Sequence, residues 1–458
     1  MELMKKNPLL AMRLQGVSIV PSSSHHQLPE LQDVLIAYGV GDGYLYEECR
    51  KWLHGDKKRR LIWLAVNIED AARCRNYEDP QVTLCTLEEP EVLKKSLYAC
   101  VGKQVCVSVL DGLDADQAQN VVQDMLSGIE LVLAKSAGFG VKPLKNTLRN
   151  FGIGYAADGL YGKFKNIPAI VCGAGPSLME KLENLRQWQD KALLFAGGSA
   201  LQPLVEAGIQ PHFGMGIDPD PDRDKVALDG CQIPFFYTSS FNADVLAGFE
   251  GPKYWVQHTG AMRLERRLFR DSGQMGEVLD LGWTVGNASV SMAVALGCNP
   301  IIIVGMDAVC DDGEIDVVDK EGRLVKSRRD LIASARWLKE FIDKHPETDF
   351  IDASKGLDFG GQQKKIQLEP LTFEMPNLEP LVIEKSDAIE KSIAQCHKLC
   401  RGAPTPRNWI ELTCELMYIE LLHPLWEIWK PVIVKEGSLE MQEWLFYQRV
   451  LKAYENQT

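Results

Sequence analysis

Short apolar runs separated by helical patterns fill the middle of the chain. Each run has the length of a single strand, and together they occupy residues 168–175, 192–199, 212–218, 234–240, 252–258, 300–307 and 349–354. Strands that alternate with helices predict a mostly parallel sheet with helices on both faces. In such sheets, ligands bind beyond the carboxyl ends of the strands, so polar residues at these ends are the candidate binding and catalytic residues.

The first 160 residues carry a second pattern of this kind. In the stretch 33–53 an apolar run leads into Gly39, Gly41 and Gly43 and then into a helical pattern, and a second apolar run begins at 59 and ends near Glu69. This order predicts a βαβ unit similar to one half of a nucleotide-binding fold. The glycine spacing departs from GxGxxG, so we favour a tight turn between strand and helix over a nucleotide-binding loop. The role of this loop stays open.

Helical patterns with aromatic stripes dominate the chain after residue 375. We interpret Trp409, Trp426, Trp429 and Trp444 as anchors of a core or an interface. The three patterns together predict three domains. These are an N-terminal α/β domain at 1–160, a central α/β domain at 161–375 and a C-terminal helical domain at 376–458.

Composition and charge narrow the class of protein. The residues are 45% hydrophobic and 25% charged, as expected for globular domains, and the net charge is −13. Such an acidic chain is not expected to coat nucleic acid or an anionic membrane. No apolar run reaches the ~18 residues of a membrane helix, so we expect a cytoplasmic protein without a membrane span. The 12 cysteines contain no CxxC pair, which disfavours a zinc site.

The stretch GAGPS at 173–177 follows the first apolar run of the central region. Gly173 and Gly175 allow the chain to turn tightly and to approach a ligand closely. Pro176 suits the first position of a helix, because the N–H that it lacks would be unpaired there. Ser177 then lies in the first helical turn, where a hydroxyl and backbone N–H groups can face an anion. The stretch predicts a phosphate-sized loop between a strand and a helix.

Similar clusters of small and polar residues follow other strands or begin other helices. These candidate residues are Gly198, Ser199, Asp218, Thr284, Asn287, Ser289 and Asp307. Because parallel strands end at one edge of a sheet, we expect these residues to share that edge with the GAGPS loop.

The order of these blocks is similar to that of a known family. GAGPSL at 173–178, GSALQPLVEAGIQPHFGMGID at 198–218, TVGNAS at 284–289 and IIIVGMD at 301–307 resemble the central domain of motility-associated factor (Maf) glycosyltransferases. The same domain family includes MptE-like 6-hydroxymethylpterin diphosphokinases. The resemblance spans about 165–375 and implies a Rossmann-type, sialyltransferase-like central domain, with an N-terminal α/β domain and C-terminal helices around it.

The resemblance implies transfer of a nonulosonic acid from a CMP-sugar to a hydroxyl of a protein or glycan. The CMP-sugar would be a substrate, and no cofactor or metal is firmly implied. Under this interpretation the 173–177 loop holds phosphate or ribose, with Gly198 and Ser199 beside it. Thr284, Asn287 and Ser289 would bind cytidine or phosphate, while Asp307 would face the pocket.

Transfer to a hydroxyl also requires a base that accepts its proton. Asp218, which would border the donor, and His258, after the apolar run at 252–258, are the two candidates. Sialyltransferases carry a histidine after the strand that ends in GxD, where this chain has Lys326 and Ser327. The identity of the base therefore stays open.

Two other functions remain open on the sequence alone. The acidic stretch DPDPDRD at 218–224 could hold Mg²⁺ with ATP, as an MptE-like diphosphokinase requires, or could be a solvated loop. A non-catalytic nucleotide-binding or scaffold protein could also keep this fold. The charged stretch 310–330 predicts a hairpin with a turn at 319–322, which either covers a site or extends into solvent.

Overall fold

The computed structural model contains the whole chain and describes most of it. The described residues are 33–74, 78–87, 105–114, 142–150, 152–222, 230–271, 276–362, 366–380, 387–433 and 438–455, with residue 226 and short stretches between 92 and 140. Contacts group the chain into two compact units. Unit 1 is 1–135 with 431–433, and unit 2 is 136–430 with 434–458. The predicted domain boundaries at 160 and 375 stay predictions, because the two units are defined by contacts between residues and not by independent folding.

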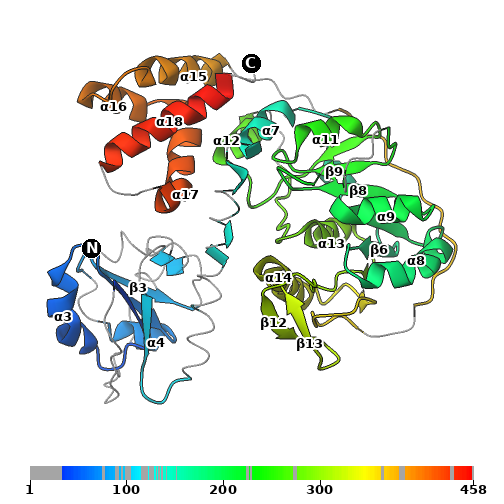
Figure 1. Cartoon of the computed structure of the whole chain (residues 1–458), viewed down its shortest axis with the longest axis horizontal. Helices are drawn as coiled ribbons and strands as arrows, with labels where there is room; N and C mark the ends of the chain where they lie inside the picture. The colour runs from blue at the N-terminus through cyan, green and yellow to red at the C-terminus, as the bar shows by residue number, and fades with distance from the viewer. Residues whose placement is uncertain are drawn as a thin grey trace. The chain divides into compact units, whose positions relative to one another are not determined.

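Unit 1 contains a four-stranded parallel sheet in the order β3-β2-β1-β4 (Figure 1). The strands are β1 (Val34–Tyr38), β2 (Arg60–Ala65), β3 (Val82–Thr86) and β4 (Val105–Val109), with helices α3 (Leu45–Gly55) and α4 (Ile68–Ala72). Alternate residues of β1 and β2 enter two separate buried clusters, one on each face of the sheet. The predicted βαβ unit is confirmed.

The main sheet of unit 2 has eight strands in the order β14-β11-β6-β7-β8-β9-β10-β5, paired in parallel throughout. Its strands are β5 (Tyr155–Ala156), β6 (Ala169–Cys172), β7 (Leu193–Gly197), β8 (Phe213–Gly216), β9 (Phe235–Tyr237), β10 (Lys253–Trp255), β11 (Ile301–Val304) and β14 (Phe350–Asp352). The chain order jumps at β6, between β11 and β7, as in doubly wound sheets. The predicted fold class is confirmed.

Helices cover both faces of this sheet (Figure 1). They are α7 (Lys142–Asn150), η1 (Ala157–Leu160), α8 (Ser177–Trp188), η2 (Gly198–Ala200), α9 (Leu201–Glu206), α11 (Ala243–Gly248), α12 (Arg263–Asp271), α13 (Val285–Leu296) and α14 (Arg329–Lys344). One face packs against α13 and α14, and the other against α8, α9 and α11. Small residues let α13 lie directly on the sheet, where eight of its twelve residues are buried.

The charged stretch after β11 forms the predicted hairpin of β12 (Ile315–Val318) and β13 (Leu324–Ser327). The turn between them is held by Lys320, whose backbone N–H donates to the Gly356 carbonyl at 2.9 Å. The Lys320 ammonium also pairs with the nearly buried carboxylate of Asp352 at 2.5 Å. The turn is therefore tied to the loop that follows β14.

The helices after residue 380 are α15 (Asp387–Cys400), α16 (Pro406–Thr413), η3 (Tyr418–Leu422), α17 (His423–Ile433) and α18 (Leu439–Glu455), and all but the last three residues of α17 belong to unit 2. Trp426 and Trp444 are buried, and the Trp444 indole donates to the Gly402 carbonyl at 2.7 Å. These two tryptophans are core anchors, as predicted. No helix among the described residues is both long and apolar enough to cross a membrane.

Candidate functional site

The carboxyl ends of β6 and β11 approach each other so closely that only glycine fits. A Cβ atom on Gly173 would lie 2.5 Å from the Gly305 carbonyl oxygen, and one on Gly305 would lie 2.5 Å from that of Gly173. Gly305 also adopts a φ of +67°, which other residues avoid. The glycines found in the sequence are therefore required by the contact between two strand ends.

Asp307 organises the loops at this edge of the sheet. Its carboxylate accepts hydrogen bonds from the Ser177 N–H at 2.8 Å, the Ser177 hydroxyl at 2.5 Å and the Lys355 N–H at 2.8 Å. Gly175 leaves the space for this carboxylate, since a Cβ there would lie 2.5 Å from an Asp307 oxygen. Both Asp307 and Ser177 are about 1% exposed. The start of helix α8 thus binds an anion that the chain itself supplies.

Unit 1 uses the same arrangement at its own glycine loop. The buried carboxylate of Asp70 accepts the N–H of Val40 at 2.9 Å and that of Val66 at 3.1 Å. It also accepts the N–H of Gly41 at 3.4 Å. The loop at 39–43 therefore encloses a carboxylate of its own chain, which agrees with its interpretation as a tight turn.

The start of α13 is capped by its own side chains. Thr284 accepts the Asn287 N–H at 3.2 Å, and the Asn287 amide donates to the Ser334 carbonyl at 3.2 Å. The Asn287 side-chain oxygen accepts the Trp283 N–H at 3.2 Å, and the Ser289 hydroxyl donates to the Val285 carbonyl at 2.9 Å. Asn287 and Ser289 are buried, so these two side chains hold α13 in place.

The two predicted loops meet at Met306, the residue between Gly305 and Asp307. Cβ atoms on Gly173 and on Gly286 would lie 2.7 Å and 2.9 Å from atoms of the Met306 side chain. At the end of β7, a Cβ on Gly197 would lie 2.2 Å from Val285. The loops after β6, β7 and β11 and the start of α13 therefore form one continuous surface.

We call this surface the edge surface. Ala174, Pro176 and Ser199 are exposed on it, and Gly198, Val285 and Gly286 are partly exposed. The first N–H groups of a helix have no partner within it, so those of Val285 and Gly286 are suited to an anion. The edge surface is rich in backbone amides and carries no charged side chain among these six residues.

The two predicted bases lie at different distances from the edge surface. Asp218 follows β8, two strands from β6, or roughly 10 Å at ~4.8 Å per strand. Its carboxylate accepts the Asp220 N–H at 2.9 Å, while the Asp220 carboxylate pairs with the Lys142 ammonium. Residues 223 and 224 of this acidic stretch lie outside the described residues.

His258 follows β10, four strands from β6, or roughly 19 Å by the same spacing. Burial, helped by the nearby Arg266 charge, lowers the pKa of His258 to about 4. The imidazole is therefore neutral near pH 7, and it is the distance from the edge surface that disfavours His258. Asp218 is therefore the better placed of the two candidates.

Two features of the site escaped sequence reasoning. The first is the loop after β14, where Gly356 has a φ of +85° and the N–H of Lys355 binds Asp307. The sequence FIDASKG, with small residues after a strand, is the signal that could have revealed it. The second is Glu265 on α12, a buried carboxyl group. Burial raises its pKa to about 7, and this effect outweighs the hydrogen bonds from Ser239 and Trp255, which lower the pKa. No local pattern distinguishes Glu265 from an exposed helix residue.

Comparison with known proteins agrees with the resemblance found in the sequence. Residues 144–313 match a family model described as 6-hydroxymethylpterin diphosphokinase MptE-like. A solved Maf glycosyltransferase from Magnetospirillum magneticum AMB-1 is similar in structure, with a TM-score of 0.52 and 15% identity. That match covers 100% of this chain and 82% of the glycosyltransferase. No curated protein matches the chain in sequence.

Both resemblances predicted from the sequence are therefore confirmed, the MptE-like one over the central region and the Maf one as a shared fold. Among the described residues, no group of three or more histidine, cysteine or acidic side chains is arranged to hold a metal ion.

Proposed function

We propose that this chain is a glycosyltransferase that binds its nucleotide-sugar donor at the edge surface. The observation that carries the proposal is the meeting of the 173–177 loop and the start of α13 on the two sides of Met306. This arrangement places the start of α13 beside the loops at the carboxyl edge of a doubly wound sheet, where ligands of such folds bind. The fold shared with a Maf glycosyltransferase supports the same reaction class.

The donor in this proposal is a CMP-activated nonulosonic acid, and the acceptor is a hydroxyl group of a protein or glycan. Because Asp307 already occupies the start of α8, we assign the phosphate of CMP to the start of α13, beside Ser199. Negative charge grows on this phosphate as the bond to the sugar breaks. The N–H groups of Val285 and Gly286 and the α13 dipole would stabilise that charge.

Asp218 is the proposed base that accepts the proton of the acceptor hydroxyl. It ends the strand next to β7 and is partly exposed. In this proposal Ser177, Asn287, Ser289 and Asp307 act on the donor through the loops that they hold, because their side chains are hydrogen-bonded within the protein.

A second candidate is a diphosphokinase that transfers diphosphate from ATP to a pterin, as the description of the matching family model suggests. Mg²⁺ would then bind the carboxylates at 218–222. The ion pair between Asp220 and Lys142 competes with that role, which is one reason to favour the first candidate. A non-catalytic nucleotide-binding or scaffold protein is the third candidate.

Calorimetry with CMP, with ATP and Mg²⁺, and with ATP and EDTA separates these candidates. The glycosyltransferase predicts that CMP binds and that ATP binds more weakly, whether or not Mg²⁺ is present. ATP binding that EDTA abolishes would favour the diphosphokinase. No heat from any nucleotide at millimolar concentration would overturn the proposal and favour a non-catalytic scaffold protein.

Ser199 offers a matched pair of variants, because its side chain is exposed on the edge surface. Ser199→Asp adds a negative charge beside the assigned phosphate and should weaken CMP binding at least tenfold. Ser199→Asn has nearly the same shape without the charge and should change the affinity less than threefold. Equal effects of the two variants would place the phosphate elsewhere.

A further inference from the structure

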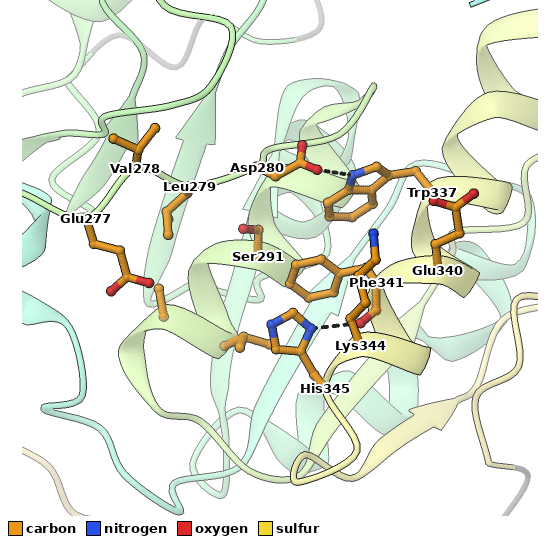
Figure 2. A pocket seen from close by; sticks show the side chains of 12 residues that line it. Glu277, Val278, Leu279, Asp280, Ser291, Trp337, Glu340, Phe341, Lys344 and His345 are labelled. Atoms are coloured by element: carbon orange, nitrogen blue, oxygen red, sulfur yellow. Dashed lines mark hydrogen bonds between the residues drawn. The ribbon is translucent and has the colours of Figure 1, made fainter. Parts of the chain in front are cut away.

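A cavity lies beside the second halves of helices α13 and α14, away from the edge surface. Its volume is about 260 Å³, and it is lined by the second halves of both helices and by residues 277–280 (Figure 2). Both helices begin at the carboxyl edge of the sheet and run back toward its amino edge. The cavity therefore lies nearer the amino edge, and neither the proposed function nor the matching family descriptions assign it a role.

One wall of the cavity is a fixed row of three aromatic rings. Trp337, Phe341 and His345 follow one another at four-residue steps along one side of α14. Trp337 stacks on Phe341 with centroids 4.6 Å apart, and Phe341 packs against His345 at 4.2 Å. The Trp337 indole donates to the Asp280 carboxylate at 2.9 Å, and the His345 ring bonds to the Phe341 carbonyl at 2.7 Å (Figure 2). These bonds hold the wall in one arrangement, so a flat ligand would meet a preformed surface.

The inner end of the cavity carries a hydroxyl group that lacks a partner. Ser291 lines the cavity and is about 3% exposed. Among the described residues, its hydroxyl makes no hydrogen bond, whereas that of Ser289, two residues earlier on α13, donates to the Val285 carbonyl. A hydroxyl that lines a cavity and has no protein partner can donate to or accept from a ligand, so the position of Ser291 favours a ligand with its own hydrogen-bonding group.

The rim of the cavity is mostly acidic. Glu277, Asp280 and Glu340 stand around it with one opposite charge, Lys344 (Figure 2). In the part of the chain that the structure describes, neither Glu277 nor Glu340 forms an ion pair. The excess of carboxylates and the electron-rich ring faces both attract a cation.

From these three features we propose that the cavity binds a small aromatic amine with a hydrogen-bonding group at the far end of its ring. The ring packs against Trp337 and Phe341, and the far group reaches the Ser291 hydroxyl. The ammonium stays at the rim between Glu277 and Glu340. This proposal does not depend on the proposed glycosyltransferase activity.

Three probes of one shape test the proposal on the full chain. Tyramine carries an ammonium, tyrosol replaces it with a neutral hydroxyl, and 3-(4-hydroxyphenyl)propionate replaces it with a carboxylate. Calorimetry should show the tightest binding for tyramine, at least fivefold weaker binding for tyrosol, and the weakest for the acid. Equal affinities, tighter binding of the acid, or no tyramine binding at 10 mM would overturn the proposal.

Variants then locate the bound amine. Glu340→Gln should weaken tyramine at least threefold and leave tyrosol unchanged, while Asp343→Asn, on the same helix outside the cavity, should change neither. Ser291→Ala should weaken tyramine but not phenethylamine, which lacks the ring hydroxyl. The urea unfolding midpoint serves as the folding control for every variant. Tyramine affinity that is the same in Glu340→Gln and Ser291→Ala as in the original chain would place its site elsewhere.

Discussion

Replacing Asp307 by Asn tests whether the start of α8 binds an internal carboxylate. The Asp307 oxygens accept from the Ser177 N–H and hydroxyl and from the Lys355 N–H, all in a buried setting. An amide keeps one accepting oxygen and places an NH₂ group where the other stood. If the NH₂ group replaces Oδ2, it faces the N–H of Ser177, and if it replaces Oδ1, it faces the N–H of Lys355. In either orientation, one backbone N–H loses its acceptor.

The size of the effect follows from these bonds. A buried N–H without a partner costs about 1–3 kcal/mol, and bonds to a charged acceptor contribute about 1.5–3 kcal/mol each, roughly twice as much as neutral ones. We therefore expect Asp307→Asn to lower the free energy of unfolding of unit 2 by about 3 kcal/mol. With a urea dependence of ~3 kcal/mol per molar, the unfolding midpoint falls by about 1 M.

Hydrogen exchange of peptides from β6 and α8, followed across a urea series, restricts the measurement to unit 2. Ser177→Ala removes only the hydroxyl bond to this carboxylate and should cost about 1.5–3 kcal/mol. Asp311→Asn, an exposed neighbour, is the matched control and should cost nothing measurable. If Asp307→Asn shifts the midpoint no more than Asp311→Asn while it weakens CMP binding, the carboxylate faces the ligand and the reasoning fails.

Three more predictions concern the surroundings of the site. Gly356→Ala should destabilise unit 2 by at least 2 kcal/mol more than Gly322→Ala in the same urea assay. Both glycines have positive φ, but only at Gly356 would the added Cβ lie 2.1 Å from a carbonyl oxygen. Equal losses of stability in the two variants would contradict this prediction. Lys320→Met removes the ammonium that pairs with the buried Asp352 carboxylate and should cost about 3–5 kcal/mol, of which Asp352→Asn in the same chain should recover a large part; no recovery in the double variant would argue against the ion pair. The pKa of Glu265 is raised to about 7 from 4.5, so this group stabilises the fold fully below pH ~4.5, and the stabilisation of about 3 kcal/mol is lost as pH rises through 7. The unfolding midpoint should therefore be higher at pH 5 than at pH 8, and Glu265→Gln should remove the share of this difference that Glu265 causes. An unchanged difference in the variant would refute the prediction.

Most strands and the hairpin can be predicted from local sequence pattern, because their formation depends mainly on neighbouring residues. The apolar runs at 168–172 and 300–304 are strands since they must be buried on both faces between helices. Gly173 and Gly305 could be located from the sequence, but what requires glycine there is the contact between two strand ends that lie far apart along the chain. The hairpin at 315–327 was predictable from its turn and charge pattern.

The candidate site was predicted as a location but not as a set of contacts. Sequence reasoning correctly grouped Gly173, Gly175, Ser177 and Asp307, and it expected all of them to face a ligand. The structure brings them together but directs the side chains of Ser177 and Asp307 toward each other. It also separates His258 from them by four strands, a distance that depends on strand order and not on sequence spacing.

The sequence by itself determined where strands end and where helices begin, because each of these depends on a few neighbouring residues. The tertiary structure alone decided which anion binds at each helix start, since Ser177 and its partner Asp307 are 130 residues apart. It alone formed the cavity between α13 and α14, where Ser291 meets an aromatic wall from another helix. Partners of this kind are chosen by packing between distant segments, and no local periodicity records that choice.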